Sequence, residues 1–223
     1  MKQSYQLTKS KFVLGLQCEK ALYLNVYHPR LAYYPPETLE RFREGRDFEA
    51  KIKALFPNGV DVSKALGMRM KEYPAMTAEL LRQPGEVNIY EAGFLYNGVL
   101  VLADVLHKDA NGDISIYEIK NSLSMKDVFI RDVSIQHYVI SHCVDIQSFS
   151  LVYNDGNDNP IYEELLDKAR EAEPSIAANV EHFKTMLQGF APEITMGEQC
   201  NTPYDCPFLR HCKRNNKTKS IWK

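Results

Sequence analysis

The stretch from Glu91 to Lys120 constrains the fold of this chain more than any other. Its sequence, EAGFLYNGVLVLADVLHKDANGDISIYEIK, contains Asn97-Gly98 and Asn111-Gly112 between three runs of aliphatic, β-branched and aromatic residues. Runs of this composition are typical of half-buried or buried strands, and Asn-Gly is a strong signal for a tight turn. The stretch therefore predicts three short β-strands joined by two turns.

Four charged side chains interrupt these apolar runs: Glu91, Asp104, Glu118 and Lys120. A buried carboxylate is costly unless it is paired or binds a metal. Glu118 and Lys120 are two residues apart on a strand, so they share a face. Asp104 lies opposite Glu118 if the loop between the last two strands has three or five residues, but opposite Ile119 if it has two. A site that contains Asp104 therefore requires an odd-length loop or a bulge.

Two opposed carboxylates repel each other unless a positive charge lies between them. A hard divalent cation, Mg²⁺ or Mn²⁺, best fits Asp104 and Glu118, because it prefers oxygen ligands and can activate a water beside a phosphoryl group. Lys120 would orient or help to deprotonate that water, or stabilise charge on the phosphate, and Glu91 is a candidate further ligand. The alternative is a Glu118–Lys120 surface pair on an edge strand, with Asp104 at a strand end.

The rest of the chain predicts helices around this sheet. Apolar spacing, capping residues and prolines indicate helices over 8–25, 36–55, 74–83, 126–142, 160–173 and 175–189, and a strand over 145–153. Pro174 is expected to separate the last two helices, and Cys143 to be a small buried residue. We expect one mixed α/β domain over 1–223, made of a helical part (1–85), a sheet core (86–155), C-terminal helices (156–199) and a basic tail with cysteines (200–223).

Charge is divided unevenly along the chain. Residues 1–72 have a net charge of +5, residues 73–199 of −12 and residues 200–223 of +5. The basic ends are either ordinary solvated surface or, if they meet in space, a surface for a polyanion. No apolar run approaches the length of a membrane span and the N-terminus lacks an apolar signal core, so we expect a cytoplasmic protein with no membrane partner.

The charged positions also carry a family resemblance. Asp104, followed after a hairpin by Glu118-Ile119-Lys120, resembles the active-site signature of PD-(D/E)XK nucleases, with Ala103 in place of the motif's proline. Gln136 and Tyr138 resemble the glutamine–tyrosine motif that follows the lysine in RecB-type nucleases. The resemblance covers most of the chain and is closest to RecB-like exonucleases related to the CRISPR-associated ones. It implies a restriction-endonuclease-like core, in which a central mixed β-sheet is flanked by helices.

One part of the family pattern is missing. Those nucleases often carry a metal-binding histidine in a Gly-x-x-x-His motif on an early helix. Here Gly45 is followed by Arg, Asp, Phe and then Glu49. Glu49 could replace the histidine as a ligand, or the position could be empty.

Four of the five cysteines lie near the ends of the chain, at positions Cys18, Cys200, Cys206 and Cys212. The last three are separated by five residues each, which is a weak signal for zinc. One early cysteine with three late ones resembles the iron–sulfur site of the same nuclease group, although the family usually has a closer pair among the last three. The resemblance implies a four-cysteine 4Fe–4S cluster that joins the N- and C-terminal segments, with zinc as an alternative. Read without the family, the four cysteines could also be unrelated.

Such a cluster would bring the two basic ends together, where nucleic acid is expected to bind. The candidate phosphate contacts are Lys9, Lys11, Lys20, Lys213, Arg214, Lys217 and Lys219. Tyr138 is a further candidate contact, and Tyr5, Tyr23 and Trp222 could stack on bases unless they are simply packed.

Two functions follow from these residues. The first is a Mg²⁺- or Mn²⁺-dependent DNA nuclease, an exonuclease for single-stranded or end-containing DNA in repair, recombination or CRISPR-type defence. Its catalytic residues would be Asp104, Glu118, Lys120 and Gln136, with Glu91 and Glu49 as further candidate metal ligands. The second is a DNA-binding or scaffold subunit of a DNA-processing complex that keeps the fold and cleaves little.

Overall fold

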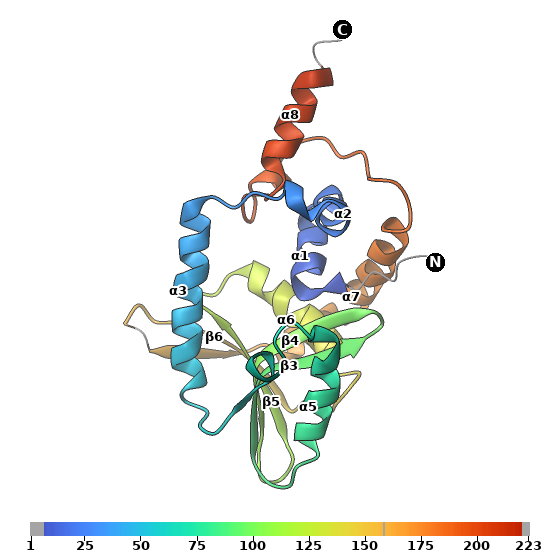
Figure 1. Ribbon diagram of the computed structural model, residues 1–223. Helices are drawn as coiled ribbons and strands as arrows, with labels where there is room; N and C mark the ends of the chain where they lie inside the picture. The colour runs from blue at the N-terminus through green and yellow to red at the C-terminus, as the bar shows by residue number, and fades with distance from the viewer. Residues whose placement is uncertain (1–6, 158, 220–223) are drawn as a thin grey trace.

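The computed structural model describes residues 7–157 and 159–219 (Figure 1). At its centre is a mixed seven-stranded sheet with the strand order β2-β3-β4-β5-β6-β7, and β1 pairs with the beginning of β4. The strands are β1 (Leu7–Thr8), β2 (Val60–Asp61), β3 (Val87–Tyr96), β4 (Val99–Lys108), β5 (Ile114–Lys120), β6 (Ser148–Asn154) and β7 (Pro160–Glu164). The predicted mixed α/β architecture is confirmed.

Helices cover both faces of this sheet. The α-helices of the described chain are α1 (Lys9–Gln17), α2 (Glu19–Tyr27), α3 (Pro36–Lys53), α4 (Val62–Leu66), α5 (Tyr73–Leu81), α6 (Asp127–Ile140), α7 (Leu166–Met186) and α8 (Leu209–Lys219), of which α8 projects away from the sheet. The main apolar core joins α1, α6 and α7 to the sheet face that carries Ile116. A second core places Phe48 and Ile52 of α3 against Ile119 on the opposite face.

The hairpin between β4 and β5 has the register that the site requires. Val105 pairs with Tyr117 and Lys108 with Ile114, so residues 109–113 form a five-residue loop. Asp109 holds this loop by accepting hydrogen bonds at Oδ1 from the backbone N–H groups of Asn111 and Asp113, at 2.8 and 2.9 Å. The prediction of an odd-length loop is confirmed, and Asp104 lies on the same face as Glu118.

The helix expected over 8–25 is two helices. The chain turns at Cys18, whose φ of −162° and ψ of 114° are extended. α1 packs Phe12 into the main core. After this turn, α2 packs Leu22 into the same core and Ala21 beside Phe208 in a separate core. Cys18 is therefore at a corner of the backbone and not inside a helix.

Three other sequence expectations were wrong. Pro174 does not divide two helices, because α7 runs through it; the proline is exposed, so the carbonyl that loses its helical partner can reach water. Residues 160–164 form the edge strand β7 instead of a helix, and Pro160 at its start is a position that an edge strand tolerates. Cys143 is exposed, because it lies in the turn after α6 and not on the buried face of that helix. The short elements β2 and α4 were not expected.

The N- and C-terminal parts of the described chain are joined to each other. Gln17 Nε2 donates to the backbone oxygens of Gln199 and Tyr204 at 2.8 and 2.7 Å. The Tyr33 N–H donates to the Pro207 carbonyl at 2.9 Å. In Figure 1 the C-terminal segment, drawn in orange and red, covers the end of α1 and α2. Within the described residues, no helix combines the length and apolar character needed to cross a membrane.

Candidate active site

Glu118 is a buried carboxylate at the centre of the site, 1% exposed. The ammonium groups of Lys120 and Lys9 lie 2.6 and 2.7 Å from its Oε1. Gln136 Nε2 donates to its Oε2 at 2.5 Å. Burial alone would raise the pKa of Glu118, but Lys120 and Lys9 lower it well below its usual range, so the side chain is ionised.

Asp104 lies beside Glu118, and its charge is compensated less than that of Glu118. Its Oδ2 accepts a hydrogen bond from the Ile119 N–H at 2.7 Å. In the described part of the chain, no lysine or arginine forms an ion pair with it. Burial raises the pKa of Asp104 well above its usual range and the charge of Glu118 raises it further, although Lys9 and Lys120 oppose this in part. The site therefore holds one carboxylate that is ion-paired with two lysines and one that the same lysines compensate only in part.

The raised pKa of Asp104 predicts that Asp104→Asn stabilises the metal-free protein near neutral pH. A carboxyl whose pKa is higher in the folded than in the unfolded state contributes most stability below its unfolded pKa, and this contribution falls as the pH rises. Asparagine keeps the acceptor for Ile119 and removes the charge. We expect a rise in Tm of a few degrees, at about 2–4 °C for each kcal/mol. This rise becomes smaller as the pH falls toward the pKa of Asp104 in the unfolded chain.

Thermal unfolding in buffer without divalent metal, at several pH values, measures this difference. Glu118→Gln is the matched control, because Glu118 has the opposite pKa shift and its neutralisation is expected to lower Tm at neutral pH. An Asp104→Asn variant that is less stable than wild type at neutral pH would contradict the electrostatic argument.

Lys120 and the helix α6 complete the site. Lys120 Nζ also lies 2.7 Å from Asp132 Oδ2 on the first half of α6. Burial would lower the pKa of Lys120, but Glu118 and Asp132 raise it well above its usual range, so the ammonium stays charged. Asp132 was missed by the sequence reasoning, although it is one helical turn before Gln136 and so lies on the same face of α6.

Gln136 and Tyr138 have different surroundings. Gln136 is fully buried with its Nε2 on Glu118, as its candidate role requires, and its Oε1 has no hydrogen-bond partner in the described structure. Tyr138 is buried beside Tyr96, with ring centroids 5.4 Å apart, and its hydroxyl accepts from Asn97 Nδ2 at 2.9 Å. Because packing and this bond occupy the side chain, Tyr138 is a core residue and not a surface for nucleic acid.

The two further candidate ligands, Glu91 and Glu49, form a second cluster with Lys53. Lys53 Nζ lies 2.5 Å from Glu49 Oε1 and 2.7 Å from Glu91 Oε1. Glu91 has a φ of 53°, the left-handed region that non-glycine residues rarely adopt, at the position on β3 opposite Asp104. Burial raises the pKa of Glu91, although Lys53 opposes this. Lys53 thus already neutralises much of the charge that these two glutamates would offer to a metal.

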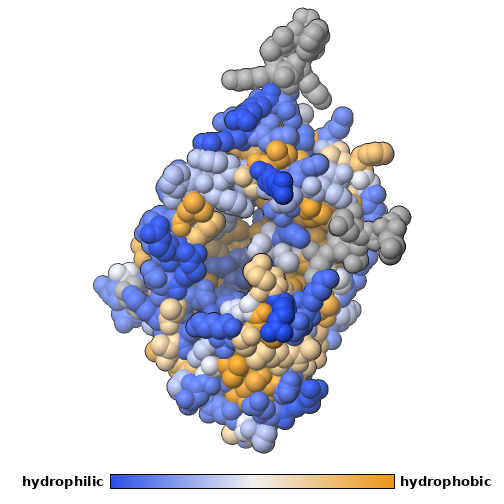
Figure 2. All heavy atoms as spheres, viewed as in Figure 1, coloured by the Kyte–Doolittle hydropathy of each residue, from blue (hydrophilic) through white to orange (hydrophobic). Residues whose placement is uncertain are grey.

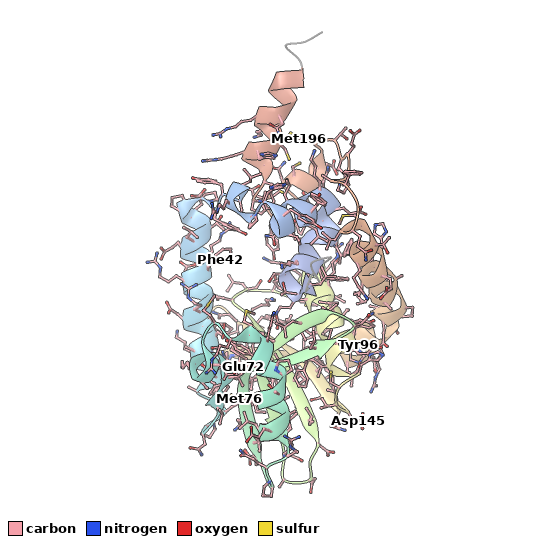
Figure 3. All side chains as sticks on the ribbon, turned by 45° about the vertical axis from the view of Figure 1, so that its right-hand side comes forward. Phe42, Glu72, Met76, Tyr96, Asp145 and Met196 are labelled. Carbon is pink, nitrogen blue, oxygen red and sulfur yellow. The ribbon has the colours of Figure 1, made fainter. Side chains whose placement is uncertain are left out.

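A groove of about 760 Å³ has Lys120 among its lining residues. Figure 2 shows it as a hollow between α3 and α1. Its charged lining has five basic side chains against two aspartates, namely Lys9, Lys11, Arg41, Lys120 and Arg210 with Asp132 and Asp205. Five aromatic rings also line it: Tyr33, Tyr34, Phe42, Phe129 and Tyr204. Figure 3 labels Phe42 on α3 beside this groove.

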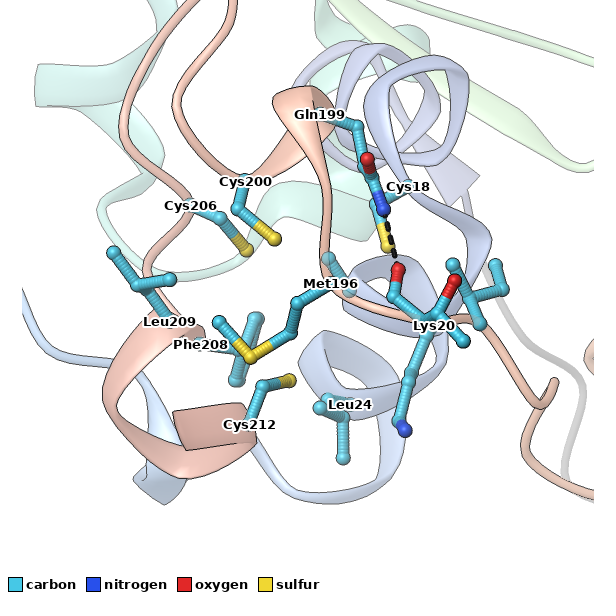
Figure 4. Close-up of a pocket in the computed structure, with 13 residues that line it drawn as sticks. Cys18, Lys20, Leu24, Met196, Gln199, Cys200, Cys206, Phe208, Leu209 and Cys212 are labelled. Carbon is cyan, nitrogen blue, oxygen red and sulfur yellow. Dashed lines mark hydrogen bonds between the residues drawn. The ribbon is translucent and has the colours of Figure 1, made fainter. Parts of the chain in front are cut away.

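The four end cysteines line one small cavity of about 20 Å³, together with Met196 and Phe208 (Figure 4). Cys206 has a pKa raised to about 11, first by burial, with smaller contributions from Cys18, Cys212 and Cys200. No group of three or more His, Cys, Asp or Glu side chains among the described residues has the arrangement of a metal site. The expected four-cysteine cluster is therefore present only as four thiols that line a shared cavity. Four thiols are nevertheless a donor set that suits zinc or an iron–sulfur cluster.

The remaining nucleic-acid candidates lie in three places. Lys9 forms an ion pair with Glu118, Lys11 lines the groove, and Lys20 lines the cysteine cavity. Lys213 and Arg214 are exposed on α8, which projects from the body in Figure 1. Tyr23 packs against Tyr27 with ring centroids 4.4 Å apart. Tyr5 and Trp222 lie outside the described residues, as do the side chains of Lys217 and Lys219.

Comparison with known proteins gives a fold but no family. No protein-family model and no curated protein matches the sequence. A solved structure described as "Crystal structure of SSO0001" matches with a TM-score of 0.50 and 17% identity, over 96% of this chain and 88% of that chain. At this identity the likeness concerns the fold alone.

Proposed function

We propose that this protein is a Mg²⁺- or Mn²⁺-dependent DNA nuclease of the PD-(D/E)XK type, with a RecB-like, restriction-endonuclease-like core. The observation that carries the proposal is the register of the β4–β5 hairpin, which puts Asp104, Glu118 and Lys120 on the same face of the sheet. That register was required by the sequence hypothesis, and a shift of one residue would have turned Asp104 to the other face.

Each of the four proposed catalytic residues has a separate task. Asp104 and Glu118 supply the oxygen ligands of the metal, whose role when bound is to activate water and polarise a phosphoryl oxygen. Lys120 stabilises negative charge that grows on the phosphate; its raised pKa favours this task over that of a base. Gln136 holds Glu118 through Oε2 and keeps its other oxygen directed to the metal.

The groove suits a single strand of DNA. Basic side chains can follow a phosphate backbone, and exposed rings can stack on unpaired bases. Tyr34 and Phe42 are 42% and 50% exposed, and Arg210 lies over the ring of Tyr33 at 3.2 Å. Because Lys9 and Lys120 line the groove and both pair with Glu118, a strand that enters it brings its phosphates near the proposed metal site. We therefore propose an exonuclease for single-stranded or end-containing DNA in repair, recombination or CRISPR-type defence.

The test of this function is cleavage of DNA that carries a fluorescent label at one end. We expect Mn²⁺ or Mg²⁺ to be required, single-stranded DNA to be cut faster than blunt duplex, and products to shorten from one labelled end. Asp104→Asn is expected to be inactive because one metal ligand loses its charge. A wild-type protein that leaves every DNA substrate intact with either metal would contradict the proposal.

We also infer that the four end cysteines bind a 4Fe–4S cluster, with zinc as the alternative. The convergence of Cys18 with Cys200, Cys206 and Cys212 on one cavity supports this. Free thiols suit the reducing cytoplasm, where we place the protein. Metal bound there would hold the C-terminal segment against α2 and so fix one wall of the groove.

A second function is favoured by the two lysines on Glu118, which compensate its charge without any metal. In that case the protein would be a scaffold or DNA-binding subunit with little turnover. Glu118→Ala would then bind single-stranded DNA as wild type does, and wild type would show no metal-dependent cleavage. Fluorescence anisotropy with a labelled oligonucleotide distinguishes the two functions when it is combined with the cleavage assay.

A further inference from the structure

Lys9 has a position that the sequence did not predict. Among the described residues that were expected to contact DNA on the surface, it alone reaches the catalytic carboxylate, with Nζ 2.7 Å from Glu118 Oε1. Its backbone is fixed there, because β1 pairs with β4 through Leu7 and Val99, and α1 begins at Lys9 itself. Lys9 also lines the groove.

In the present arrangement, the hydrogen-bond donors around Glu118 leave no room for a metal ion to bind Oε1. Oε1 carries two ammonium groups, and Oε2 carries the amide of Gln136. A divalent cation that binds through Oε1 must therefore displace one of the two lysines. Lys120 is retained by its second partner, Asp132, at 2.7 Å. Within the described residues, Glu118 is the carboxylate with which Lys9 forms an ion pair, so Lys9 is the donor that can leave.

We propose that Lys9 is an internal counter-ion that occupies the metal-facing oxygen of Glu118 and moves to a phosphate of the bound strand when the metal takes its place. The inference rests on the proposed nuclease function and adds a residue to it. The side chain of Lys9 has four methylene groups, so its ammonium can turn from Glu118 into the groove that it already lines. The exchange keeps the charge of the site balanced, because a divalent cation and a phosphate enter together.

Direct binding of Mn²⁺ tests the first half of this exchange. Lys9→Met keeps the length of the side chain and removes the charge. It is expected to bind Mn²⁺ about tenfold tighter than wild type, a change of about 1.4 kcal/mol, because the metal no longer competes with an ammonium. Titration of free Mn²⁺ by electron paramagnetic resonance measures this affinity without activity. A merely structural role of Lys9 predicts the reverse, since a loosened site binds metal more weakly.

Cleavage at saturating Mn²⁺ tests the second half. There Lys9→Met is expected to have a kcat at least about tenfold lower than wild type, because the phosphate has lost a cation. Lys11→Met is the matched control. Lys11 lies on the same helix and lines the same groove, but the ion pair with Glu118 is formed by Lys9. It is expected to leave the Mn²⁺ affinity unchanged. Asp104→Asn is expected to abolish Mn²⁺ binding at this site, and so shows which part of the measured binding belongs to it.

Lys9→Gln keeps a donor to Glu118 and serves if the methionine variant does not fold. Either folded variant with unchanged or weaker Mn²⁺ affinity overturns the counter-ion role, and the proposed function stands if wild type still cleaves DNA. If wild type shows no Mn²⁺ binding that depends on Asp104, the counter-ion role and the nuclease are both overturned.

Discussion

Lys120→Ala is expected to reduce DNA cleavage by about 10²–10³-fold while the protein remains folded. Groups that stabilise charge in a transition state have effects of this size when they are removed. Lys120 has the required charge and position. Its ammonium forms ion pairs with Glu118 and Asp132, and the residue lines the groove. Initial rates at saturating Mn²⁺, with circular dichroism to confirm folding, measure the loss.

Lys126→Ala is the matched control for this variant. Both lysines lie over the ring of Phe129, with Nζ 5.9 Å from the centroid for Lys120 and 5.8 Å for Lys126. The control removes a lysine from the same ring without touching Glu118, so its rate should stay within a few-fold of wild type. Equal activity of Lys120→Ala and wild type would remove Lys120 from the mechanism.

The second large effect concerns stability. Cys206→Ala is expected to lose the metal of the cysteine site and to lower Tm by about 10 °C or more. Structural metal sites contribute several kcal/mol to folding, and about 1 kcal/mol corresponds to 2–4 °C in a chain of this size. Protein purified without air is analysed for iron, sulfide and zinc, for visible absorption and for thermal unfolding.

Cys143→Ala is the control, because Cys143 is exposed and lies outside the cavity. It should keep the metal content and Tm of wild type. Iron with sulfide would identify the 4Fe–4S cluster, and zinc without colour would identify the alternative. A wild-type protein that contains neither metal, with Cys206→Ala equally stable, would contradict a metal role for the four cysteines.

The central strands could be predicted from the sequence because their signals are local. Asn97-Gly98 and Asn111-Gly112 mark two turns, and the requirement that Asp104 face Glu118 restricts the second hairpin to an odd-length loop, which is the loop that the chain adopts. The helix containing Gln136 was found for the same reason, through its regular apolar spacing.

The errors concern positions where distant residues decide the structure. After the break at Cys18, α2 contacts both the main core and a separate core around Phe208, which is far away in the sequence. Pro174 is tolerated because its side of α7 faces solvent, which sequence spacing alone does not reveal. Lys9 and Lys53 were not placed on carboxylates because the pairing of β1 and the packing of α3 set their positions.

The helix α1 has a further consequence for how this sequence can change. Lys9 is its first residue and Cys18 directly follows its last, so one rigid element sets the distance between the carboxylate of Glu118 and the cysteine cavity. One inserted residue would rotate Cys18 by about 100° around the helix axis and move it by about 1.5 Å. Either Lys9 or Cys18 would then miss its partner. The eight residues between them are therefore a fixed spacer, free to change in identity on the exposed side but not in number.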